Sequence, residues 1–269
     1  MAVDYLILKN CKVKEQLTPD QLVSTIKDRN RAYQVRDMLA NSGKSQAEID
    51  NFEFTFQKMT PNGVENSKHK ISDLIAQTAI LDQLSPICTD CPVANGKPFG
   101  CLGAVGYPIS AKCENWLAQI AEESYKKGEV YSMMLTYILD QKVSGKESDD
   151  ARKQGDTFFE LKRPIEIVLS KSFFSKKAVN TSQLIDMILG VRVMQFTHMN
   201  HLLMLFGGVF LDDTQPTDRP SKFNEDQKKF MYLGLELPQD ADKSIYDFYL
   251  LFHQIFLTMV NDVDIAFDR

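Results

Sequence analysis

The chain has 269 residues, a formal net charge of −5, 43% hydrophobic residues and 25% charged residues. These values are ordinary for a globular protein of one large domain or two small ones. The negative charge argues against a broad phosphate-binding surface, so we do not expect nucleic acid as a partner. The sequence opens without a charged leader followed by an apolar run and a cleavage site, which predicts a cytoplasmic chain with reduced thiols.

The first part of the sequence combines short strand patterns with helix patterns. The apolar run over residues 5–8 predicts a buried strand. Thr18 followed by Pro19 is typical of a helix start, and the helix is expected to continue to about Asn41. Phe52, Phe54 and Phe56 alternate with polar residues, which predicts a strand with three rings on one face. A turn over 60–63 and a helix over 71–84 follow.

Four of the five cysteines lie together, with the spacing Cys-x2-Cys-x9-Cys-x11-Cys. A Cys-x2-Cys step lets two thiolates face one tetrahedral ion, and the intervening Gly and Pro residues allow the chain to turn. We therefore predict a structural zinc knuckle held by Cys88, Cys91, Cys101 and Cys113. An iron–sulfur cluster is the alternative metal group, and reduced cysteines acting as small apolar residues are the alternative without metal. Cys11 is expected to be a core residue.

The stretch between residues 144 and 156 is polar, contains two glycines and lacks apolar periodicity. It predicts a linker or an exposed loop, and hence an N-terminal α+β region over 1–143 and a mainly helical region over 157–269, or one continuous domain. Helical patterns precede it over 116–120 and 131–138.

The C-terminal part is expected to be mostly helical. Asn180 is typical of a helix start, and the apolar stretch over 191–211 predicts a buried segment. It is not expected to span a membrane, because His198, Asn200 and His201 would be costly in hydrocarbon. The two histidines share a helix face, yet they suit a core or a surface better than a metal site. A final helix from Ser244 to about 263 is apolar nearly all round, and the acidic end after it is expected to be solvated.

These patterns predict a predominantly helical α+β fold with a small N-terminal strand component and a four-cysteine zinc-knuckle loop. The function that we expect is that of a non-catalytic, zinc-containing binding or regulatory protein, with structural metal and another protein as partner. The alternative is an enzyme, either an iron–sulfur redox protein or a hydrolase whose site is assembled only in three dimensions. The sequence identifies no catalytic residue.

Overall fold

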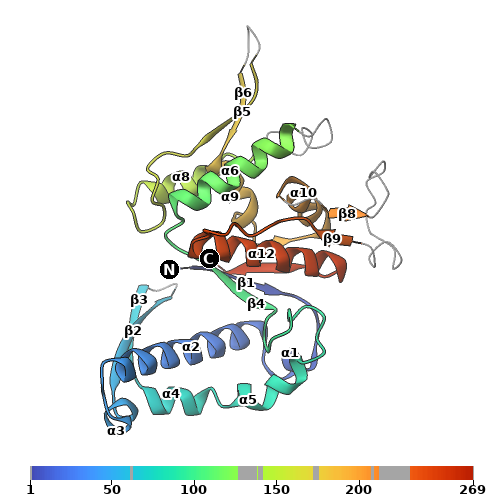
Figure 1. Ribbon diagram of the computed structural model, residues 1–269. Coiled ribbons are helices and arrows are strands. Elements are labelled where there is room, and N and C mark those ends of the chain that lie inside the picture. Colours follow the sequence, from blue (N-terminus) through green and yellow to red (C-terminus); the bar gives the residue numbers. More distant parts are fainter. Residues whose placement is uncertain are drawn as a thin grey trace. The chain divides into compact units, whose positions relative to one another are not determined.

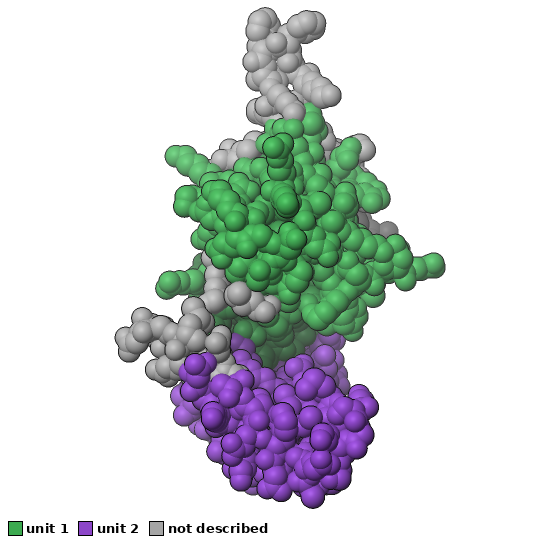
Figure 2. Space-filling view, turned by 90° about the vertical axis from the view of Figure 1, so that its left-hand side faces the viewer, with its two compact units in different colours: residues 1–9, 100–269 green, residues 10–99 purple. Residues whose placement is uncertain are grey.

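The computed structural model describes residues 2–60, 63–126, 138, 142–171, 176–206, 209–211 and 231–268. The chain divides into two compact units, shown in different colours in Figure 2. Unit 1 comprises residues 1–9 and 100–269, and unit 2 comprises residues 10–99. Unit 2 is therefore inserted between the first two strands of unit 1. The division points differ from the boundary predicted between residues 143 and 157.

Unit 1 is built on a four-stranded antiparallel sheet with the order β4-β1-β10-β7. The strands are β1 (Ala2–Ile7), β4 (Leu102–Gly106), β7 (Val193–Met194) and β10 (Ile265–Asp268). Tyr5 of β1 lies opposite Phe267 on one side and Gly103 on the other. The expected strand over 5–8 is confirmed as part of β1. The expectation of an N-terminal strand component is wrong, because β10 lies between β1 and β7. Asp262 and Asp268 are exposed, as expected for the acidic end.

The core of unit 1 forms where three helices meet around Phe252. The helices are α6 (Ala111–Lys126), α10 (Phe196–Phe206) and α12 (Lys243–Val260), and α12 packs against β4 (Figure 1). The Phe252 ring is fully buried and stacks on Phe206 with ring centroids 5.0 Å apart. Trp116 of α6 meets the same ring edge-on at 6.5 Å. The expected final helix is confirmed, with its N-cap at Asp242.

The described part of unit 1 also contains two further helices and two further pairs of strands. They are α8 (Lys146–Arg152), α9 (Thr181–Leu189), β5 (Glu166–Lys171) with β6 (Lys176–Asn180), and β8 (Val209–Leu211) with β9 (Met231–Leu233). The Asn180 side chain caps α9 as expected. The linker or exposed loop expected over 144–156 is wrong, because most of this stretch forms α8 and Arg152 is buried. The helix expected over 131–138 lies outside the described residues, except for residue 138.

The apolar stretch over residues 191–211 contains three short elements. They are β7, the 11-residue helix α10 and β8. Among the described residues, no helix has the length and apolar character needed to cross a membrane. Seven residues of α10 are buried within unit 1, as expected for a core helix.

Unit 2 packs short helices and one hairpin around the long helix α2. Its elements are α1 (Lys12–Gln16), α2 (Pro19–Asn41), α3 (Gln46–Asp50), β2 (Glu53–Thr60), β3 (Gly63–Lys70), α4 (Ile71–Gln77), α5 (Ile80–Leu84) and the 3-10 helix η1 (Ser85–Cys88). The start of α2 is confirmed, because Thr18 and Gln21 cap one another's backbone N–H groups. The helix expected over 71–84 is interrupted at Thr78 and forms α4 and α5. A cluster of Leu39, Ile49 and Ile71 forms the apolar centre between α2, α3 and α4.

Candidate functional site

The cysteines predicted to form one metal knuckle belong to different parts of the fold. Cys88 and Cys91 lie in unit 2, whereas Cys101 and Cys113 lie in unit 1. Within the described part of the chain, no three or more His, Cys, Asp or Glu side chains are grouped so that they could hold a metal ion. The four-cysteine knuckle predicted as part of the fold is therefore wrong.

The local geometry explains why the cysteine spacing was misleading. The tight turn predicted for Cys-x2-Cys is present, because the Cys91 N–H donates to the Cys88 carbonyl oxygen over 3.2 Å. After Cys101, however, the chain enters β4, and Cys113 lies fully buried in α6. Burial raises the pKa of the Cys113 thiol, although a hydrogen bond with Ser244 acts against this shift. The pKa of Cys88 is also raised by burial, and a hydrogen bond from the Phe99 N–H lowers it in part.

The histidines contact backbone carbonyl groups and an aromatic ring. The Nε2 atom of His198 lies 2.8 Å from the Met187 carbonyl oxygen, and burial lowers the pKa of this imidazole. The Nδ1 atom of His201 lies 2.5 Å from the carbonyl oxygen of Thr197. The His253 ring packs on Tyr249 with centroids 4.5 Å apart. These contacts hold His198 and His201 in the fold, in agreement with the expectation of core or surface histidines, whereas Nε2 of His253 is buried without a hydrogen-bond partner in the described structure.

A buried polar cluster joins three helices of unit 1, and the sequence analysis did not find it. Arg152 of α8 donates to both carboxylate oxygens of Glu114 on α6, over 2.8 and 2.5 Å. The same guanidinium donates to the Ser182 hydroxyl over 3.0 Å and to the Leu161 carbonyl oxygen over 2.7 Å. Thr181 of α9 adds a further hydrogen bond to Glu114. The two charges neutralise one another, and α6, α8 and α9 are held together by the shared contacts.

A hollow of about 620 Å³ borders this cluster. Its walls are formed by Asp149, Arg152, Lys153, Gly155, Lys162 and Pro164. The charges around it largely cancel, because Arg152 is paired with Glu114 and Lys153 with Asp150. Most of the hydrogen-bonding capacity of Arg152 is also used within the protein, so we assign a structural role to this region.

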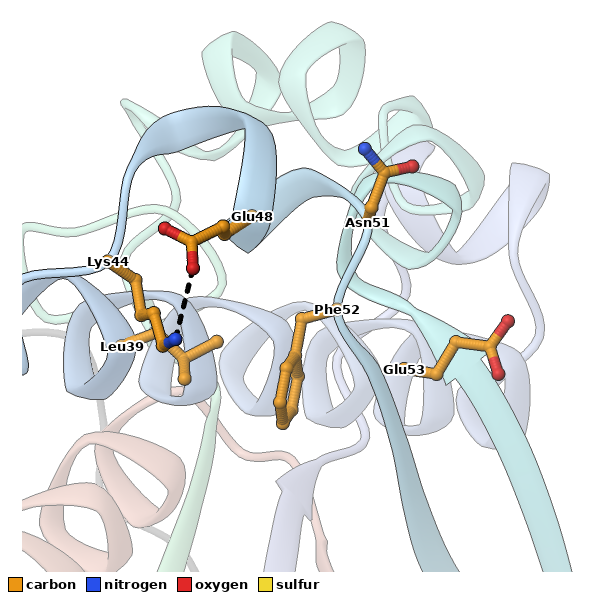
Figure 3. A pocket seen from close by; sticks show the side chains of 6 residues that line it. All are labelled: Leu39, Lys44, Glu48, Asn51, Phe52 and Glu53. Carbon is orange, nitrogen blue, oxygen red and sulfur yellow. Dashed lines mark hydrogen bonds and ion pairs between the residues drawn. The ribbon is translucent and has the colours of Figure 1, made fainter.

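The second hollow, in unit 2, has a different character, and we call it the α3 hollow. It has a volume of about 470 Å³ and is lined by Leu39, Lys44, Glu48, Asn51, Phe52 and Glu53. Leu39 comes from the end of α2, and Phe52 lies between α3 and β2. Figure 3 shows the Phe52 ring pointing towards α2, on the side of β2 that faces away from β3. The Phe52 residue is 38% exposed, so the α3 hollow presents apolar surface to its surroundings.

Charged side chains form the rim of the α3 hollow. Lys44 and Glu48 are joined by an ion pair of 3.0 Å, drawn as a dashed line in Figure 3. The Glu48 carboxylate also accepts hydrogen bonds from the backbone N–H and the hydroxyl of Ser45, over 2.9 and 2.8 Å. The Ser45 backbone and Lys44 together lower the pKa of Glu48 to about 2. Glu53 is exposed, and no described residue forms an ion pair with it, although Lys70 lies opposite in the strand register.

β2 begins at the α3 hollow, because Glu53 is both its first residue and part of the lining. The edge of β2 that faces away from β3 is called its outer edge. In the described structure β2 pairs only with β3. The Ile71 N–H donates to the Phe52 carbonyl oxygen over 3.3 Å, so these two residues form a hydrogen-bonded pair. In an antiparallel hairpin, hydrogen-bonded pairs alternate with pairs that are not hydrogen-bonded. Phe54 and His69 are the next bonded pair, and the backbone N–H and C=O of Thr55 therefore point to the outer edge. The α3 hollow thus lies beside an open strand edge.

The strand predicted around Phe52, Phe54 and Phe56 is β2, which begins at Glu53, so Phe52 lies just before the strand. Phe54 packs against the Leu39–Ile49–Ile71 cluster, whereas Phe52 precedes β2 and forms a wall of the α3 hollow. The alternation of side chains between the two faces of a sheet holds only for residues within a strand. The signal that could have found the site is the run of carboxylates around a single aromatic ring in residues 48–53.

Comparisons with known proteins give no relative: no protein-family model, curated protein or solved structure matches this chain.

Proposed function

We propose that the chain is a non-catalytic binding protein, and that unit 2 binds a partner protein at the α3 hollow. The observation that carries this proposal is the exposed apolar surface around Phe52. Phe52 is 38% exposed beside the buried Leu39, and Met38, the neighbour of Leu39 in α2, is 61% exposed. Aromatic and methionine side chains are enriched in protein interfaces, where a few of them supply most of the binding free energy.

The charge of the α3 hollow favours a protein over a nucleic acid. Its lining carries two carboxylates, Glu48 and Glu53, and one ammonium group, Lys44. Lys44 is already paired with Glu48, so the remaining charge is that of a carboxylate. A phosphate backbone would be repelled here, whereas an apolar side chain with a neighbouring cation would be attracted.

The proposal is tested by photo-crosslinking in the native cells. A benzoylphenylalanine residue replaces Asn51, which lines the α3 hollow, in the full-length protein; the control carries it at Tyr246, which is 48% exposed in unit 1. A protein that crosslinks only from position 51 is identified by mass spectrometry and purified, and its affinity is measured by calorimetry. Phe52→Ser should weaken this binding by about tenfold or more, and Tyr246→Ser should leave it unchanged. Equal binding by Phe52→Ser would contradict the proposal.

A further inference from the structure

We infer that the partner binds as an extended peptide segment that adds a strand to the outer edge of β2 and places an apolar side chain in the α3 hollow. This inference rests on the proposed function and adds the mode of binding and the chemistry of the partner. The backbone of β2 offers hydrogen-bonding groups at its outer edge. The N–H and C=O of Thr55 point to the outer edge of β2, and β2 has no second neighbouring strand in the described structure. An open edge of this kind is a template for strand addition.

The α3 hollow lies next to the start of that edge. Phe52 immediately precedes β2, and Glu53 is its first residue, so two walls of the α3 hollow continue directly into the strand. Figure 3 shows the Phe52 ring on the side of β2 opposite to β3, together with Leu39 and Lys44, whereas the Glu53 carboxylate points to the other side. A peptide paired with β2 would therefore pass the hollow, and one of its side chains could fill the space between Leu39 and Phe52.

The charge of the residues that line the α3 hollow specifies the chemistry of the peptide. Glu53 carries the carboxylate on the rim that no described residue neutralises through an ion pair, whereas Lys44 and Glu48 neutralise one another. A lysine or arginine close to the apolar anchor would complement Glu53 and raise the association rate. The partner segment is therefore an extended stretch with one large apolar residue flanked by a basic residue.

The experiment uses short random peptides displayed on phage and selected on the full-length protein. Selected sequences should share an apolar residue with a neighbouring Lys or Arg. One selected peptide is then synthesised, and its affinity is measured by fluorescence anisotropy. Phe52→Ser should weaken it by about tenfold or more, whereas Glu53→Gln should mainly slow association and reduce its dependence on salt.

Backbone methylation of that peptide tests the strand pairing itself. Methyl groups on alternate peptide nitrogens should abolish binding, and those on the intervening nitrogens should be tolerated, because only every second N–H of an added strand faces β2. If methylation weakened binding equally at every peptide nitrogen, or at none of them, the inference would be overturned.

A matched pair of proline variants tests the same point on the protein. Thr55→Pro removes an N–H from the outer edge of β2, and Lys68→Pro removes the corresponding N–H from the outer edge of β3. Neither substitution removes a β2–β3 hydrogen bond, and circular dichroism checks that both variants fold. Only Thr55→Pro should abolish peptide binding.

The outcomes separate the binding mode from the proposed function. A crosslinked partner that needs Phe52 but binds equally well to Thr55→Pro would overturn strand addition and leave the binding function standing. Failure to select any peptide, or selected peptides that bind Phe52→Ser as well as the parent protein, would also overturn the inference. The proposed function is contradicted only by a partner whose binding is independent of Phe52.

Discussion

Arg152 and Glu114 form a two-point ion pair inside unit 1, with their side chains 3% and 0% exposed. Two such charges are costly to remove from water, and they are tolerated here because each also accepts or donates hydrogen bonds within the cluster. Removing one member of the pair should therefore lower the stability most, since the other member then remains buried without its counter-charge.

Arg152→Met is expected to lower the free energy of unfolding by about 3–5 kcal/mol, because Glu114 would be left as an uncompensated buried charge. Chemical denaturation monitored by circular dichroism measures this change. The control is Lys153→Met, which removes an ion pair of an exposed lysine with Asp150 and should change stability by about 1 kcal/mol or less. The double variant Arg152→Met with Glu114→Leu should recover part of the loss. Similar effects of the two single variants would show that the buried pair has no special role.

Phe252→Ala is expected to destabilise unit 1 by about 3–5 kcal/mol, because its ring is fully buried between Phe206 and Trp116 and its removal leaves a cavity. Tyr246→Ala, on the same helix but 48% exposed, should change stability by less than about 0.5 kcal/mol. The midpoints of thermal unfolding of the two variants are compared with that of the parent protein. An unchanged midpoint for Phe252→Ala would contradict the packing described around this ring.

Glu48 should titrate well below its ordinary pKa of 4.5, at about 2. The Ser45 backbone N–H and the Lys44 ammonium favour the ionised carboxylate in the fold. Because the folded-state pKa is lowered, the stabilisation is present above about pH 4.5 and is lost as the pH falls towards 2. Carbon-13 NMR of the Glu48 carboxyl group measures this titration, and Lys44→Met should raise the pKa. A value near 4.5 in the parent protein would show that the cap and the ion pair do not form in solution.

The Cys113 thiol should resist alkylation in the native protein. It is fully buried and its pKa is raised by burial, and both effects suppress the reactive thiolate. Cys11 and Cys91 are only partly buried and should react with iodoacetamide first. Peptide mapping by mass spectrometry follows the order of modification, and denaturant should make Cys113 reactive. If Cys113 reacted as fast as Cys91 without denaturant, the core of unit 1 would have to open readily.

Local signals in the sequence were reliable where the physical cause is also local. Thr18 with Pro19 and Asn180 were identified as helix starts because a cap involves residues only three positions apart. The apolar face of the final helix predicted its central position for a similar reason, since helical periodicity needs no knowledge of the partner.

Signals that depend on distant parts of the chain failed. The strand component was expected in the N-terminal region, but β10 at the other end of the described residues pairs with β1, which lies more than 250 positions earlier. The sequence also could not predict that Glu114 and Arg152 meet, since they are 38 positions apart and belong to no motif. The cysteine spacing suggested a common site, and the division of the chain after Phe99 placed its members in different units.

The place of β10 in the sheet has a consequence for synthesis on the ribosome. β1 is translated well before β10, its neighbour in the sheet, which lies at residues 265–268. Residues 10–99 form a contiguous unit that can fold as soon as it emerges, whereas β1 waits for its neighbour β10 until β10 has been translated. During that interval the apolar face of Val3, Tyr5 and Ile7 has no complete sheet to join and stays open to other contacts.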